Sequence, residues 1–478
     1  MPINSFLYPG VKVTPVFEVA NSIRYDDGAG DSLTRSQSTP SSQRIFTFSA
    51  WVKRAYLNLD PSDPNKQFFS QHNNTTDRMD FRFQSGGTID FFHNSPRIRI
   101  TTNRLFRDVS AWYHIVLRID TTQATAADRA RLYVNGVQET SFSTADYGSQ
   151  NADLGTNYST FAVGDDSFGT GHFDGYFAEV VYCDGQSLDP TSFGEFDSDT
   201  GIWKPIDVSG LTFGNNGFYL DFQNSGSLGA DVSGNGNNFT VNNLTSIDQT
   251  TDTPTNNFCT LNPLDKAIVG TQPTFSEGNL QWLASSNSTS NCSVRSTMGV
   301  SSGKWYFEAK FIESSATTLG YHLDGNNPLY DSTGYIGSNA GFYGIFITGG
   351  DDNSDKIVAG TYTDTDFGAI NNNDIVGVAF DLDNGKFYFS KNGTWLNSGD
   401  PTSGATGTGS FGDLASGTYI PTVCTNSFNT ASNTSFNFGS PAYSISSGNS
   451  DANGYGNMEF AVPSGYYVLN SKNLAEFG

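Results

Sequence analysis

The chain has 478 residues, enough for two or three independently folded cores. Only 15% of the residues are charged, whereas 51 are glycine, 38 phenylalanine and 22 tyrosine, a composition typical of short strands joined by turns. A mainly helical protein is excluded. The net charge of −23 opposes the binding of nucleic acid or of an anionic membrane surface, since its field repels phosphate.

The first 21 residues form an apolar segment with three prolines, too short to build its own core. We expect it either to pack as a terminus on the next domain or to act as a docking arm that adds a strand to a partner. Its candidate contact residues are Phe6, Tyr8, Val11, Val13 and Phe17. The start has no secretory signal pattern and no apolar run long enough to span a membrane, so we expect synthesis in a cytoplasm without membrane insertion.

Residues 22–222 alternate with the period of strands that bury one face. In the segment Phe46–Val52 every second side chain is apolar, and the segment Trp112–Ile119 repeats this pattern. The dipeptide Asn135-Gly136 predicts a tight hairpin, because a type I′ turn needs positive φ at both central residues. These features predict a first antiparallel sandwich over residues 22–222.

A segment rich in Asn, Thr and Gly, residues 223–274, has little periodicity and is predicted to be a connector. The alternative is an ordered segment, since Phe239, Val241 and Leu244 could pair locally. Alternation resumes at Trp305–Phe311, and Ile375–Leu382 begins a three-strand meander. We therefore predict a second sandwich over residues 275–445. The tail, residues 446–478, is expected to end in a strand at Tyr466–Leu469.

Several motifs resemble known families. Residues 22–222 resemble a concanavalin-A-like, laminin-G-type jelly roll in the segments FTFSAWVKR, AWYHIVLRID, RLYVNGVQ and GHFDGYFAEVVYCDGQSLDP. Residues from about 300 to 440 resemble a SPRY (B30.2-like) domain in SSGKWYFEAK and DIVGVAFDLDNGKFYFSKNGTW. The predicted fold class is thus all-β, with two tandem antiparallel β-sandwiches, concanavalin-A-like and then SPRY-like, behind an N-terminal arm.

The tandem, joined through GFYLDF, DVSGNGNNFT and CTLNPLD, resembles structural proteins of marine, cyanophage-like bacteriophages. The resemblance implies a virion protein, with a tail-associated fibre or spike favoured over a position on the capsid surface. It would bind a glycan or protein receptor on the host cell and dock other virion proteins through its arm. A homo-oligomer, with a trimer favoured, is expected. The alternatives are a capsid-displayed fibre or decoration protein and a concanavalin-like glucan hydrolase.

Hydrolysis needs two carboxylates about 5–9 Å apart. The E-x-D-x-x-E strand motif of concanavalin-like hydrolases is absent, and Glu179 is the single acid of Tyr176–Tyr182, with Asp174 expected on the opposite face. The five histidines are isolated, and His114 is expected on the outward face of its strand. The four cysteines form no metal or disulfide pattern, so we expect buried or idle thiols. No catalytic residue is predicted, and a protein without enzymatic activity is expected.

A structural Ca²⁺ is the one cofactor that the concanavalin-like resemblance implies. Its candidate ligands are Asp26, Asp27, Asp165, Asp166 and Asp174, since Ca²⁺ prefers carboxylate oxygens. Their spacing matches no fixed calcium loop, and the alternative is a set of solvated turn aspartates.

Two groups of residues are candidates for binding. The segment Leu319–Phe346 holds aromatic rings among amides, which suits stacking on a sugar and bonding of its hydroxyls; the alternative is a self-packed loop. The candidate ligand residues are Tyr321, Tyr330, Tyr335, Tyr343 and Trp395. Arg97, Arg99, Arg104 and Arg107 form a basic cluster in an acidic chain, predicted to be either a solvated edge strand or a subunit or virion contact.

Overall fold

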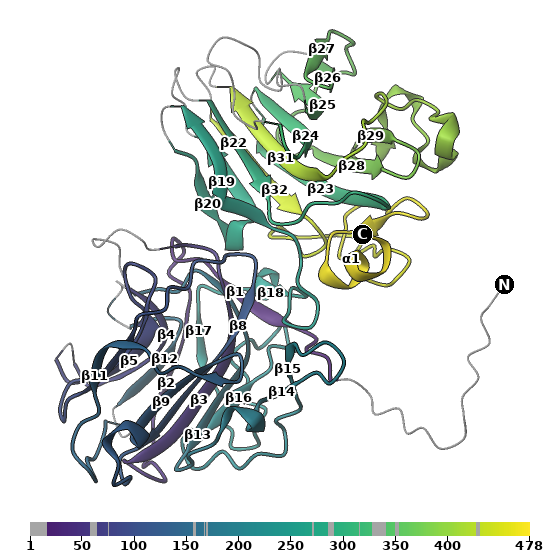
Figure 1. Cartoon of the computed structure of the whole chain (residues 1–478). Coiled ribbons are helices and arrows are strands. Elements are labelled where there is room, and N and C mark those ends of the chain that lie inside the picture. The colour runs from purple at the N-terminus through teal and green to yellow at the C-terminus, as the bar shows by residue number, and fades with distance from the viewer. Residues whose placement is uncertain are drawn as a thin grey trace, which may run out of the picture.

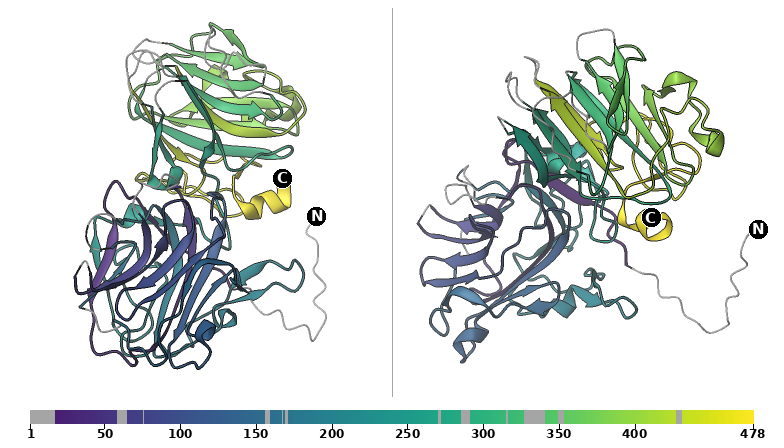
Figure 2. Two further views of the ribbon diagram at one scale, coloured as in Figure 1. Left: turned by 60° about the vertical axis from the view of Figure 1, so that its left-hand side comes forward. Right: turned by 45° about the horizontal axis from the view of Figure 1, so that its top comes forward.

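The computed structural model describes residues 17–57, 65–74, 76–155, 159–166, 168, 171–269, 272–284, 291–314, 316–326, 341–348, 353–426 and 431–478. Two β-rich bodies are stacked on each other, as Figures 1 and 2 show. The prediction of an all-β chain of antiparallel sandwiches is confirmed. Among the predicted contact and ligand residues, Phe6, Tyr8, Val11, Val13, Tyr330 and Tyr335 lie outside the described residues.

The first sandwich consists of two large sheets and a small one. One large sheet runs in the order β10 (Val137–Gln138), β9 (Ala130–Val134), β8 (Trp112–Asp120), β3 (Ile45–Arg54), β13 (Gly175–Asp184), β1 (Ser22–Tyr25) and β18 (Gln249–Thr250), with β16 (Phe218–Leu220) paired to β13. The facing sheet runs β11 (Phe142–Asp146), β7 (Ile98–Thr102), β6 (Ile89–His93), β5 (Arg78–Phe83), β4 (Lys66–His72), β12 (Thr160–Val163), β2 (Ser32–Ser36) and β17 (Thr240–Asn242). The strands β14 (Gly194–Phe196) and β15 (Trp203–Pro205) form the small sheet.

The second sandwich also has two sheets. One runs β19 (Leu261–Val269), β22 (Asn291–Ser296), β31 (Tyr419–Asn426), β24 (Thr317–Leu323), β25 (Phe342–Ile347), β26 (Ser354–Val358) and β27 (Thr361–Thr363). The other runs β20 (Thr274–Ser276), β21 (Gln281–Ala284), β32 (Ser432–Asn437), β23 (Lys304–Glu313), β28 (Ile375–Asp381), β29 (Lys386–Lys391) and β30 (Thr394–Trp395), with β33 (Tyr467–Val468) parallel to β23.

Helices are short. The 3₁₀ turns are η1 (Ala126–Asp128), η2 (Pro190–Ser192), η3 (Ser246–Asp248), η4 (Glu277–Asn279), η5 (Leu396–Ser398) and η6 (Pro401–Thr406). The α-helix α1 (Ser471–Phe477) lies near the junction of the two bodies in Figure 1. Over the described ranges, no helix has the length and apolar character needed to cross a bilayer. All four cysteines are free and buried, as expected.

The alternation seen in the sequence sets the core faces. Phe46, Phe48 and Val52 on β3 are fully buried, and Phe48 packs against Phe69 of the facing sheet with ring centroids 4.8 Å apart. Trp305 and Phe307 occupy the same kind of position in the second core. Each sandwich therefore has its own apolar centre.

The segment predicted as a connector is built into the sandwiches instead. Its residues Val241 and Gln249 pair with Leu33 of β2 and Ile23 of β1, and β19 begins at Leu261, before the expected start of the second domain. Phe239 lies in the first core. The lack of periodicity predicted a connector with local pairing as the alternative, whereas Val241 pairs with a strand far away in the sequence.

Candidate functional site

A row of four side chains crosses the outer face of the first sandwich. Trp112, Lys53, Tyr176 and Arg24 are paired in register across β8, β3, β13 and β1. Because successive side chains alternate in a strand, this row points away from the core that holds Val52. Lys53, Tyr176 and Arg24 are nevertheless 1% exposed, since residues that follow β18 and the second sandwich cover them.

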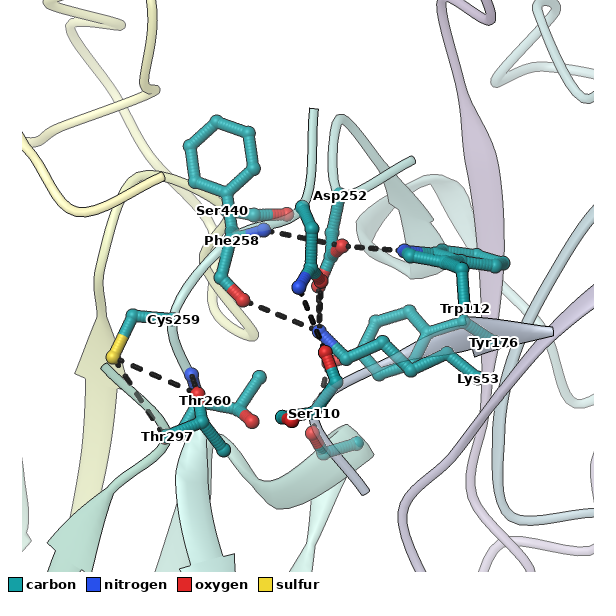
Figure 3. Close-up of polar contacts among 12 residues, drawn as sticks. Lys53, Ser110, Trp112, Tyr176, Asp252, Phe258, Cys259, Thr260, Thr297 and Ser440 are labelled. Atoms are coloured by element: carbon teal, nitrogen blue, oxygen red, sulfur yellow. Dashed lines mark hydrogen bonds and ion pairs between the residues drawn. The ribbon is translucent and has the colours of Figure 1, made fainter. Parts of the chain in front are cut away.

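Lys53 lies at the centre of the junction between the two sandwiches (Figure 3). Its Nζ donates to Asp252 Oδ2 and Asn257 Oδ1, both at 2.8 Å, and to the carbonyl of Phe258 at 3.2 Å. The other oxygen of Asp252 accepts from the indole Nε1 of Trp112 at 3.1 Å. All three donors of the ammonium are satisfied, so a charge that would be costly alone is compensated.

Arg24 makes the second set of contacts. Its Nε lies 3.1 Å from Glu277 Oε2, and its other nitrogens donate to the carbonyls of Ile247 and Pro441. Beside it, the hydroxyl of Tyr176 donates to the carbonyl of Gly278 at 2.8 Å.

The turn η4 presents its residues to the first sandwich because its backbone is left-handed throughout. Glu277, Gly278 and Asn279 have φ of 53°, 63° and 66°. Asn279 Nδ2 donates to the carbonyl of Ala55 at 3.1 Å. Non-glycine residues rarely adopt this conformation, so the turn is retained by its contacts across the junction.

A groove of about 500 Å³ opens beside the contact between Ala55 and Asn279, and we call it the junction groove. From the first sandwich it is lined by Asp27, Ala55, Tyr56, Leu57 and Asp174; from the second by Pro263, Leu264, Lys266, Gln272, Pro273, Thr274, Phe275 and Asn279. Tyr56 is 40% exposed and Leu264 is 55% exposed. The groove therefore offers accessible ring and aliphatic surface beside amides and carboxyls.

The two carboxyls of the junction groove have different surroundings. Asp27 forms an ion pair with Lys66, whose ammonium lies 5.0 Å from the ring centroid of Tyr56. Burial, followed by the charge of Asp27, raises the pKa of Asp174 well above its usual range. The carboxyl of Asp174 is therefore protonated more readily than that of an exposed aspartate, while Asp27 offers acceptor oxygens beside Lys66.

The predicted calcium ligands do not form an oxygen cage. Lys66 pairs with Asp27, His172 Nδ1 lies 3.2 Å from Asp165 Oδ1, and backbone N–H groups donate to Asp26 and Asp166. Within the part of the chain that the structure describes, no three His, Cys, Asp or Glu side chains are placed to hold a metal ion. Cations and N–H groups take oxygens of four of the five aspartates, Asp26, Asp27, Asp165 and Asp166, that a Ca²⁺ cage would need, so the set does not fit Ca²⁺.

The prediction that Tyr321 and Tyr343 contact a ligand is wrong. Residues 319–323 and 342–346 belong to β24 and β25, and both tyrosines point into the second core. The ring of Tyr321 lies 3.9 Å from that of Phe380, centroid to centroid. Trp395 is half-buried, with its ring 6.4 Å from that of Tyr306. Aromatic residues next to glycines and amides predicted a binding loop, whereas strand alternation buries Tyr321 and Tyr343.

Two of the four arginines of the basic cluster form ion pairs within the first sandwich. Arg97 pairs with Asp146 at 3.2 Å and Arg99 with Asp90 at 2.9 Å. Arg104 lies over the ring of Phe106, and Arg107 is exposed. The expectation of a solvated edge strand is wrong, because β7 lies between β6 and β11.

Phe17 is the one predicted arm residue that the structure describes. It is half-buried and packs against a cluster of Val19, Trp51, Trp112, Tyr176, Ala178 and Trp203 on the outer face of the first sandwich. The start of the described chain is thus attached to the same face as the junction.

His114, predicted on the outward face of its strand as a solvated or interface side chain, is buried there beneath Trp203 of β15. Its ring lies between Trp51 and Trp203, and the indole Nε1–H of Trp203 donates to Nδ1 at 2.9 Å. Nε2 therefore carries the proton and donates to Ser49 Oγ at 2.8 Å. Burial lowers the pKa of His114 to about 3. An imidazole whose Nε2 is already protonated cannot take the proton of Ser49, so this pair does not form an activated nucleophile.

A family model described as the concanavalin A-like lectin/glucanases superfamily matches residues 27–186. No curated protein matches the chain. The resemblance of the first sandwich to concanavalin-like domains is confirmed over this range.

Three solved structures are similar to parts of the chain. The SPRY domain of human HERC1 has 12% identity and a TM-score of 0.28, covering 37% of this chain and 96% of that one. A putative carbohydrate binding protein from Bacteroides ovatus has 15% identity and a TM-score of 0.34, covering 47% and 59%. A heptameric SAP-like pentraxin from Limulus polyphemus has 15% identity and a TM-score of 0.27, covering 36% and 79%.

Proposed function

We propose that this protein is a non-enzymatic adhesion protein of a bacteriophage particle, a tail-associated fibre or spike that binds a host-surface glycan in the junction groove. The observation that carries the proposal is an accessible Tyr56 ring beside hydrogen-bonding groups from both sandwiches. The phage assignment rests on the resemblance of the tandem sequence to phage structural proteins.

The chemistry of the groove suits a sugar. A pyranose presents an apolar face of C–H groups, which packs on an aromatic ring such as Tyr56, and a rim of hydroxyls that both donate and accept. Asp27 supplies acceptor oxygens, and the carboxyl of Asp174 and the amides of Gln272 and Asn279 also line the groove. Because the junction contacts hold both walls, binding requires little ordering of the protein.

The remaining contacts follow from the same proposal. Residues 1–21 dock the chain onto other virion proteins, and Phe17 marks where this arm leaves the first sandwich. The assembled particle carries the protein as a homotrimer on the tail. Gold-labelled antibody against the second sandwich should mark tails; labelling confined to the capsid shell contradicts the tail assignment and favours a decoration protein.

Replacement of Tyr56 tests the groove. Tyr56→Ala should weaken binding of the purified chain to host surface polysaccharide about tenfold, the free energy of roughly one aromatic contact. The matched control is Tyr362→Ala on β27, since that ring is 39% exposed but lies outside the groove. Equal affinity of the two variants would refute the groove as the binding site.

The same carboxyls test the absence of hydrolysis. The wild-type chain should release no reducing sugar from the polysaccharide it binds, and Asp174→Asn should leave this unchanged. Sugar release by the wild type that is lost in Asp27→Asn and Asp174→Asn would replace the proposal with a glucan hydrolase.

A further inference from the structure

A second cavity, of about 400 Å³, opens at the same junction beside the contact between Thr250 and Ser440. One wall belongs to the first sandwich and consists of Ser246, Ile247, Gln249, Thr250 and Thr251. The other follows β32 of the second sandwich and consists of Ser440, Pro441, Tyr443, Ser444 and Ile445, and the lining is completed by Asn21, Ser225 and Asn457. The structure describes every residue of both walls. We call this cavity the uncharged pocket.

The lining has no formal charge. Among its described residues none is Asp, Glu, Lys, Arg or His, although the chain as a whole carries −23. The lining consists of hydroxyls and amides with the ring of Tyr443 and the aliphatic side chains of Ile247 and Ile445. A charged ligand would lose its hydration here without gaining an ion pair, so the pocket selects for an uncharged one.

Several polar groups of the pocket have unused hydrogen-bonding capacity. Among the described residues, the side chains of Asn21, Ser225, Thr251 and Ser444 form no hydrogen bond with the protein. Each can both donate and accept, and they come from four separate segments around the cavity. A ligand with several hydroxyls placed around a compact ring complements this arrangement.

The two walls are held in place from behind. The guanidinium of Arg24 donates to the carbonyl of Ile247 on one wall at 3.1 Å and to that of Pro441 on the other at 3.2 Å. Its charge is balanced by Glu277 and Asp248. Arg24 is fully buried, so the pocket is present before any ligand arrives and binding need not order the junction.

We propose that the uncharged pocket binds a neutral saccharide unit, such as an unmodified hexose, as a site separate from the junction groove. The inference goes beyond the proposed adhesion in the groove, since it rests on different residues. A chain with both sites would contact a surface polysaccharide at two points, and the second contact would add avidity.

The test uses the full chain and three probes of similar size: methyl glucoside, glucuronate and glucosamine. Saturable binding of methyl glucoside, followed by ligand-observed NMR or calorimetry, is expected near 1 mM, as for a small polar ligand. Glucuronate and glucosamine should bind at least tenfold more weakly. Equal binding of the three probes, or no saturable binding of methyl glucoside, overturns the proposal.

Filling the pocket locates the site. Thr251→Trp places a large side chain at an exposed position and should reduce methyl glucoside binding at least tenfold without unfolding the chain. The matched control is Thr361→Trp on β27, also exposed and outside both cavities, which should bind as the wild type does. Unchanged binding by Thr251→Trp overturns the proposal.

Tyr56→Ala separates the two sites. It should leave methyl glucoside binding intact while weakening polysaccharide binding in the groove. If Tyr56→Ala alone abolishes binding of both, the groove is the saccharide site and the uncharged pocket is not. If Thr251→Trp alone abolishes both, the pocket stands and the adhesion site has been assigned to the wrong cavity.

Discussion

The cores of the two sandwiches and the junction between them are stabilised by different interactions. Each core is a cluster of aromatic and aliphatic side chains, for example Phe161 against Phe218 in the first and Phe307 against Phe438 in the second. The junction instead buries Lys53 and Arg24 with carboxylates and carbonyls. Apolar burial stabilises without fixing direction, whereas charge-assisted hydrogen bonds require particular donor and acceptor positions.

The difference indicates a division of roles. The cores fold the two domains, and the junction sets their relative orientation. The junction groove and the uncharged pocket both have walls from the two sandwiches, so both depend on that orientation. Loss of the junction is therefore expected to affect binding as well as stability.

The largest effect is expected from Lys53→Met, which leaves Asp252 buried and unpaired. Breaking a buried ion pair by removing one partner costs about 3–5 kcal/mol. The free energy of unfolding, measured with urea, should fall by this amount. Calorimetry should resolve two transitions, because the sandwiches no longer unfold as one unit.

Arg44→Met is the matched control for that prediction. Arg44 Nε lies 2.6 Å from Asp153 Oδ1, but both side chains are exposed, at 41% and 55%. Solvent screens such a pair, and its removal should cost less than about 1 kcal/mol. Equal losses in the two variants would show that the junction contributes no more than a surface ion pair.

A smaller effect is expected at the left-handed turn. A Cβ built on Gly278 would lie 2.3 Å from the hydroxyl oxygen of Tyr176, so Gly278→Ala must displace η4 or the ring. Overpacking of this kind costs about 1–3 kcal/mol beyond the backbone strain. Gly201→Ala is the control, since its φ of 72° is similar and no atom lies within 4 Å of the added carbon. If urea unfolding shows the same loss of unfolding free energy in both variants, backbone strain alone accounts for it and the junction accommodates the added methyl group without cost.

Strand alternation correctly predicts which side chains of a strand face the core. It does not predict which segments cover the opposite face. In β3 it correctly places Phe46, Phe48 and Val52 in the core. It also places Trp51 and Lys53 on the outer face of the strand. The sequence of one strand does not show whether that face is exposed to solvent or covered by another part of the chain. Their partners Trp203 and Asp252 lie about 150 and 200 residues further along the chain, so no local pattern reveals them.

The candidate site could not be predicted from local sequence patterns either. The groove is formed by residues on separate segments, such as Asp27, Tyr56 and Phe275, that share no motif. The predicted site at Tyr321 and Tyr343 failed for the opposite reason, because a motif-like composition proved to be core strands. A signal for the junction was present in the sequence: Lys53 and Arg54 end an apolar strand, where charged residues need partners if covered. This signal does not identify the partner residues.

The smallest effect concerns a buried carboxyl that has no cationic partner of the kind found at the junction. Glu179 lies in the β-bulge of β13 with a φ of 50°, and its carboxyl accepts from the hydroxyl of Tyr219 at 2.6 Å. Burial raises its pKa from 4.5 to about 7, so between these values the folded chain holds a proton that the unfolded chain releases. Stability from this group is therefore complete below about pH 4.5 and is lost as the pH rises towards 7, by at most about 1.4 kcal/mol per pH unit.

Glu179→Gln should remove that dependence: the fall in its free energy of unfolding from pH 6 to pH 7 should be about 1 kcal/mol smaller than in the wild type. Parallel curves for the two proteins over this interval would show that Glu179 is ionised and compensated in the fold, as Asp252 is by Lys53.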